Sequence, residues 1–111
     1  MKIIREFAPA DRYVYDFGIC SSKNGFAQVD TDQDASYYGT WASPKKLAIV
    51  CYCEGDVTTT ICDNTDEFVS QIEELKKWND ESGHNFKGID PGFNVDLKQS
   101  FISIGLEKYL H

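Results

Sequence analysis

Residues 47–63, LAIVCYCEGDVTTTICD, constrain the fold more than any other stretch of the chain. They predict two β-strands, over 46–53 and 57–62, which are rich in β-branched residues and joined at Glu54-Gly55-Asp56. Side chains alternate between the two faces of a strand. In the first strand this places Leu47, Ile49, Cys51 and Cys53 on one face and Ala48, Val50 and Tyr52 on the other, so both faces are largely apolar. We therefore expect this hairpin to lie at the centre of a sheet that is covered on both sides.

Further elements are expected on either side of the hairpin. Alternating apolar residues and turn signals predict three earlier strands, over 12–20, 26–31 and 37–41. Two helices are predicted after the hairpin, from Asn64 or Thr65 to about Gly83 and from about Asp96 to Leu110, with a structured loop over 84–94. The sequence thus predicts one α+β domain over 1–111, an antiparallel β-meander of about five strands followed by two helices packed on one face.

The first predicted helix has both a start signal and an apolar stripe. Asn64 followed by Glu67 resembles a capping box, in which each residue bonds a free backbone amide of the first turn. Apolar residues then recur at helical spacing and are expected to face the sheet. They are Phe68, Val69, Ile72, Leu75 and Trp78.

Charge excludes several classes of function. The chain has 18 acidic and 11 basic residues, a net charge of −7, which argues against direct binding of nucleic acid or of an anionic membrane. Residues 41–83 hold 9 of the acidic and 4 of the basic residues. The negative charge is therefore concentrated on the hairpin and the first helix, where it suits a partner protein with a basic surface.

The expected location is the cytoplasm. No apolar stretch approaches the roughly 20 residues that a membrane span needs. The start, MKIIREFAPADR, does not resemble a secretory signal, so the cysteines are expected to be reduced thiols.

Three of the four cysteines, Cys51, Cys53 and Cys62, lie in the hairpin. Zinc needs four convergent ligands, commonly with a CxxC pair on a turn, whereas Cys51 and Cys53 form a CxC pair in mid-strand. We interpret these thiols as small core residues. A metal site on the three cysteines is the alternative hypothesis, and no metal or other cofactor is predicted.

An acidic run, Asp30, Asp32 and Asp34, resembles the first half of a calcium loop. That loop requires a glycine and a glutamate at positions where this chain has Ala35 and Trp41, so we interpret the run as a solvated acidic loop. Tyr38 stands beside it. Aromatic side chains next to acidic ones fit a basic protein partner rather than a nucleic acid.

Catalytic motifs are absent from the sequence: it contains no GxSxG, HExxH, P-loop or GxGxxG pattern. No catalytic residue is predicted. The alternative is a small enzyme or ligand-binding domain with a pocket near the loop 84–94, which would use His84, Asp90 and either Glu54 or Asp56.

Four segments together resemble a family of small uncharacterised proteins carried on bacterial plasmids, phages and other mobile elements. They are DFGICS at 16–21, QDASYYGTW at 33–41, CEGDVT at 53–58 and KGIDPGF at 87–93. The resemblance implies a bacterial setting on a mobile element and transfers no functional residue. In that setting, small acidic proteins often block host defence by occupying a basic surface that binds nucleic acid.

The predicted function is therefore that of an acidic, cytoplasmic protein-binding domain, an inhibitor of a host nucleic-acid-binding defence complex in the manner of an anti-CRISPR protein. A second copy of the chain is a further candidate partner, because an edge strand can pair two copies. The expected partner-binding residues combine the acidic loop with the carboxylates of the first helix: Asp30, Asp32, Asp34, Tyr38, Glu67, Glu73, Glu74, Asp80 and Glu81.

Overall fold

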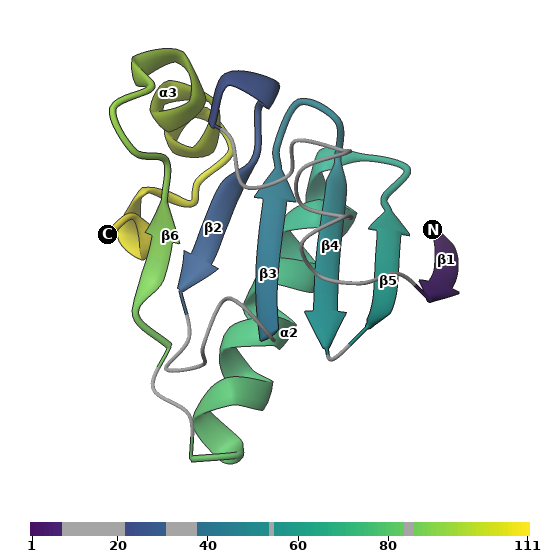
Figure 1. Ribbon diagram of the computed structural model, residues 1–111. Helices are drawn as coiled ribbons and strands as arrows, with labels where there is room; N and C mark the ends of the chain where they lie inside the picture. Colours follow the sequence, from purple (N-terminus) through teal and green to yellow (C-terminus); the bar gives the residue numbers. More distant parts are fainter. Residues whose placement is uncertain (8–21, 31–37, 54, 84–85) are drawn as a thin grey trace.

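The computed structural model describes residues 1–7, 22–30, 38–53, 55–83 and 86–111 (Figure 1). Within these ranges the strands form an antiparallel sheet of six, in the order β1-β5-β4-β3-β2-β6. The strands are β1 (Lys2–Phe7), β2 (Ala27–Asp30), β3 (Tyr38–Ser43), β4 (Ala48–Cys53), β5 (Asp56–Ile61) and β6 (Gly88–Asp90). The helices are η1 (Ser22–Asn24), α2 (Thr65–Glu81), α3 (Val95–Ser103) and η2 (Glu107–Tyr109), of which η1 and η2 are single 3-10 turns.

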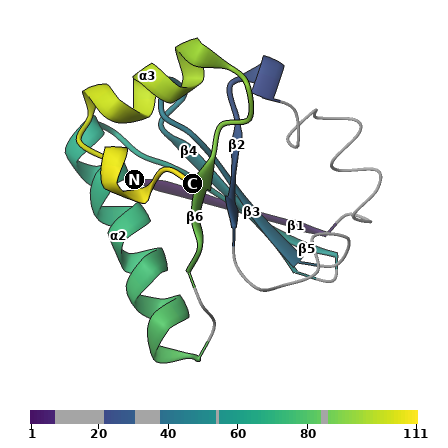
Figure 2. The same ribbon diagram turned by 90° about the vertical axis from the view of Figure 1, so that its left-hand side faces the viewer.

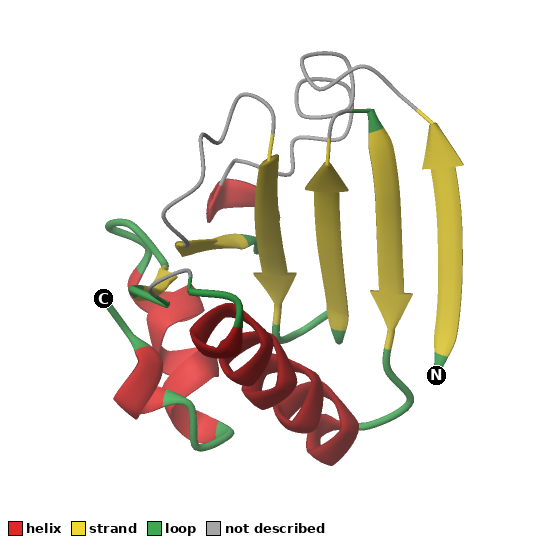
Figure 3. Ribbon diagram, turned by 90° about the horizontal axis from the view of Figure 1, so that it is seen from below, coloured by secondary structure: helices red, strands yellow, loops and turns green. Residues whose placement is uncertain are grey.

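Both α-helices lie on the same side of the sheet (Figures 2 and 3). They cover it through one core cluster in which Phe68 and Ile72 of α2 and Phe101 of α3 are fully buried. The sheet contributes Val29, Ile49 and their neighbours to the same cluster. The predicted α+β class, with helices packed on one face of an antiparallel sheet, is confirmed.

The opposite face of the sheet has an apolar cluster of its own. It consists of Phe26, Trp41, Ala48, Val50, Tyr52 and Val57, all of them buried. Since Ile49 belongs to the core beneath the helices and Val50 to this second cluster, β4 is buried on both faces. The sequence prediction of a central, doubly covered strand is therefore correct.

Two strands are not expected from the sequence. β1 comes before the first predicted strand and pairs along its whole length with β5, from Lys2 opposite Ile61 to Phe7 opposite Asp56. Most of its side chains are exposed, and its sequence, KIIREF, does not alternate between apolar and polar residues in the way that identifies a strand. β6 lies within the expected loop 84–94 and pairs with β2.

The last predicted helix is shorter than expected. α3 ends at Ser103 instead of continuing to Leu110, because Gly105 has φ +89°, a left-handed conformation that ends a helix. The chain then turns, so that Leu106 is fully buried. The strand predicted over 12–20 lies outside the described residues. None of the helices in the described ranges has the length and apolar character that a membrane span requires.

Gly39 provides a test of packing on the second face. A Cβ atom at Gly39 would overlap the Trp41 ring, and that ring cannot turn away into solvent without exposing a residue that is only 3% exposed. We expect Gly39→Ala to lower the free energy of unfolding, measured by denaturant titration, by roughly 1–3 kcal/mol, the usual cost of overpacking. In a Trp41→Phe background the same substitution should cost clearly less, and an equal cost in both backgrounds would contradict this account.

Candidate partner-binding surface

Local hydrogen bonds fix the start of α2. The Asn64 side chain accepts a hydrogen bond from the backbone N–H of Glu67 at 2.8 Å. The Glu67 carboxylate accepts in turn from the N–H of Asp63 at 3.1 Å, one residue before the predicted partner. The first bond satisfies an amide that the helix itself leaves free, and the second ties the residue before the N-cap to the first turn. The predicted start of the helix is confirmed.

The buried side of α2 differs from the predicted stripe at its C-terminal end. Phe68 and Ile72 are buried as expected, but the stripe continues to Asn79, which is 2% exposed, and not to Trp78. At 100° per residue, Asn79 lies about 20° around the helix from Phe68 and Trp78 about 80°. The Asn79 side chain is buried without a penalty because its Nδ2 donates to the Leu75 carbonyl at 2.9 Å.

Trp78 instead forms part of the outer surface, with 55% of its area exposed. Residues four before and three after it on a helix are its surface neighbours, and here these are Glu74 and Glu81. Both are exposed, and no ion pair involves either of them in the part of the chain that the structure describes. We call Glu74, Trp78 and Glu81 the Trp78 ridge.

The other carboxylates predicted on α2 have partners within the chain. Glu73 lies 3.8 Å from Nζ of Lys108. Asp80 accepts a hydrogen bond from Lys76, which raises the pKa of that lysine. Glu67 is occupied by the cap at the start of the helix. Exposed pairs of this kind add little stability, but they reduce the charge that these residues offer to a partner.

For the predicted acidic loop, the structure describes only the backbone of the two end residues. Asp30 is the last residue of β2, opposite Gly88, and Tyr38 is the first residue of β3, opposite Cys53. Asp32 and Asp34 lie outside the described residues, as do the side chains of Asp30 and Tyr38. The loop part of the predicted surface therefore stays a prediction.

The cysteines have the environments of core or near-surface thiols. Cys51 packs against the core and accepts a hydrogen bond from the Thr40 hydroxyl at 3.7 Å, and its burial raises the pKa of its thiol. Cys62 is 4% exposed, and the pKa of its thiol is raised mainly by burial and also by the negative charge of Glu67. Cys53 is exposed. Among the described residues, no group of His, Cys, Asp and Glu is arranged to hold a metal ion.

The structure separates two of the carboxylates proposed for an alternative catalytic pocket. Asp56 begins β5 and Asp90 ends β6, and the sheet order places these strands four positions apart. At about 4.8 Å per strand, they are separated by roughly 19 Å, too far for a shared site. Asp90 caps its own turn by accepting from the N–H of Gly92 at 2.9 Å. Glu54 and His84 lie outside the described residues.

A hollow of about 440 Å³ does lie beside the end of the 84–94 loop, and its rim holds three lysines. Lys76 is paired with Asp80, and Lys108 with Glu73 and, at 5.1 Å, with the Tyr109 ring. Phe86 and Tyr109, which also line it, meet edge to face with ring centroids 5.9 Å apart. Four of the side chains that line this hollow thus interact with other described parts of the chain.

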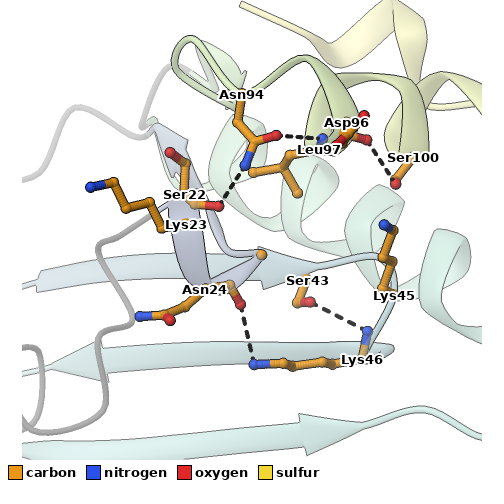
Figure 4. A pocket seen from close by; sticks show the side chains of 11 residues that line it. Ser22, Lys23, Asn24, Ser43, Lys45, Lys46, Asn94, Asp96, Leu97 and Ser100 are labelled. Atoms are coloured by element: carbon orange, nitrogen blue, oxygen red, sulfur yellow. Dashed lines mark hydrogen bonds between the residues drawn. The ribbon is translucent and has the colours of Figure 1, made fainter.

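A second hollow, of about 330 Å³, lies between η1, the β3–β4 turn and the start of α3 (Figure 4). Asn94 joins two of its walls, because its Oδ1 accepts from the N–H of Leu97 and its Nδ2 donates to the Ser22 carbonyl at 2.8 Å. Lys46 donates to the Asn24 carbonyl at 3.2 Å. No motif in the sequence predicts this cluster, because its residues come from three separate segments.

Comparison of the chain with protein-family models, with curated proteins and with solved structures found no match.

Thiol reactivity tests the interpretation of the cysteines. In a Cys20→Ser variant, which leaves the three thiols that the structure describes, Ellman's reagent should modify only Cys53 rapidly in the folded protein. Cys51 and Cys62 should react only after denaturant is added. The same experiment on a Cys20→Ser, Cys53→Ser variant should show no rapid phase, and a rapid phase there would contradict the interpretation of Cys51 and Cys62 as core thiols.

Proposed function

We propose that this chain is a protein-binding domain that attaches to a basic surface of a partner through the Trp78 ridge on α2. The observation that supports the proposal most strongly is the 55% exposure of Trp78 on a helix whose core side is already filled. A large aromatic side chain that is more than half exposed on a rigid element is typical of the anchor residue of an interface.

The neighbours of Trp78 indicate the chemistry of the partner. Glu74 and Glu81 are exposed carboxylates that have not been neutralised by a lysine or arginine within the described residues. An arginine of the partner could pair with either carboxylate while its guanidinium stacks on the indole ring. The ridge therefore favours arginine-rich surfaces over acidic or purely apolar ones.

The proposed consequence is inhibition. Arginine-rich surfaces in bacterial proteins commonly hold the phosphates of nucleic acid. The two carboxylates of the Trp78 ridge would compete with those phosphates for the same arginine side chains. With its net charge of −7, the chain would also approach such a surface faster than a neutral protein does. We therefore propose that the partner is a nucleic-acid-binding complex, in keeping with an inhibitor of host defence on a mobile element.

The test uses the chain as affinity bait in a bacterial lysate, followed by a binding assay with the purified partner. Wild-type protein should displace a labelled nucleic acid from that partner, measured by fluorescence anisotropy. Trp78→Ala should weaken binding by about 2 kcal/mol or more, roughly 30-fold in Kd, because an anchor residue is lost. The double variant Glu74→Lys with Glu81→Lys should bind the partner more weakly than Trp78→Ala does, and its binding should depend less on salt concentration.

Two matched controls locate the effect on the ridge. Phe93, in the turn before α3, is a fully exposed aromatic residue outside the ridge, and Phe93→Ala should leave binding unchanged. Glu107→Lys changes a single exposed charge in η2, outside the ridge, and should also bind normally. The proposal is wrong if Trp78→Ala binds as wild type does, or if the captured partner keeps its nucleic acid in the presence of the chain.

A further inference from the structure

The two edges of the sheet differ in how they are protected. At the β6 edge, the C-terminal residues lie alongside the strand: Leu110 bridges to Ile89, and the N–H of His111 donates to the Ile89 carbonyl at 2.9 Å. At the other edge, β1 pairs with β5 on one side, and no described strand lies on its other side (Figure 3). A free strand edge offers a row of backbone donors and acceptors to another strand.

The open edge also gathers exposed apolar side chains. Met1 is 51% exposed, Ile3 50% and Phe7 79%, and Ile61 of the neighbouring strand is 37% exposed. β1 has no proline and its pairing with β5 is continuous, so neither a proline nor a bulge interrupts the edge. The strand is thus suited to pairing with a further strand, provided that its charged side chains find partners there.

The sequence of β1 is complementary to itself. Two identical antiparallel strands in one sheet are related by a two-fold axis perpendicular to the sheet, which keeps each side chain on its own face. Directly opposite residues must therefore be separated by an even number of positions along the sequence. For β1 the central registers are those with the axis at Ile3, at Ile4 or at Arg5.

Only one of these registers matches opposite charges. With the axis at Ile4, Lys2 of each copy lies opposite Glu6 of the second copy, and the two Ile4 side chains meet between these pairs. With the axis at Arg5, the two Arg5 side chains oppose each other and Glu6 faces Ile4. With the axis at Ile3, Lys2 faces Ile4 and Glu6 loses its partner.

We propose that the chain forms a symmetric homodimer through β1, in the register centred on Ile4. The two sheets then continue as one, and both α2 helices lie on the same face of it because the axis is perpendicular to the sheet. This inference does not depend on the proposed function, since the Trp78 ridge takes no part in it.

Sedimentation equilibrium and light scattering across the micromolar range test the proposal. Wild-type protein should show the mass of two chains at the higher concentrations. Lys2→Glu alone places two glutamates opposite each other in each cross-strand pair, and Glu6→Lys alone places two lysines there. Each variant should raise the dimer dissociation constant about tenfold or more, because two attractive pairs become repulsive.

Charge exchange keeps the proposal falsifiable where a single variant is ambiguous. The double variant Lys2→Glu with Glu6→Lys should dimerise again. An equimolar mixture of the two single variants should form a heterodimer, since every cross-strand pair in it is then attractive. Lys45→Glu, an equal change of charge in the exposed β3–β4 turn, should dimerise as wild type does. A monomeric wild-type chain at all concentrations, or a failure of the mixture to associate, would overturn the proposal.

Discussion

The structure depends on a central strand, β4, that is buried on both faces. Ile49 packs with α2 and α3, while Val50 and Tyr52 pack into the cluster on the opposite face. A strand with two apolar faces is stable only when both are covered, so β4 requires a layer on each side. Its neighbours β3 and β5 follow from this arrangement, because both pair with β4 along six residues.

The same constraint explains which parts of the fold are predictable from the sequence. The hairpin of β4 and β5 has strong β-branched runs around one turn, and α2 has an amide cap and an apolar period, so both are identified with nearly correct bounds. β1 and β6 escape prediction for a physical reason. β1 is held mainly by backbone pairing at an exposed edge, and β6 is too short to show a period.

The candidate surface is predictable only in part. The acidic residues of α2 are visible in the sequence, but their availability depends on partners from elsewhere in the chain. Lys108 lies 35 residues after Glu73, and no pattern in the sequence predicts that they meet. Helical spacing alone assigns Trp78 to the apolar stripe, whereas the helix buries Asn79 instead and satisfies its amide with the Leu75 carbonyl. Trp78 is thus exposed because the buried side of the helix passes through the next residue, Asn79, which lies about 100° further around the helix axis.

The arrangement of the two surfaces has a consequence for affinity. A two-fold axis through Ile4 would place both α2 helices on the same face of the continuous sheet. A dimer would therefore carry two Trp78 ridges on that face. If the partner has two or more copies of its basic surface, the second Trp78 ridge of a bound dimer binds at a high effective concentration. The affinity then rises without any new type of contact. A partner with a single groove would gain nothing from dimerisation. The dependence of binding on chain concentration therefore distinguishes a repeated partner, such as a nucleoprotein array, from an isolated enzyme.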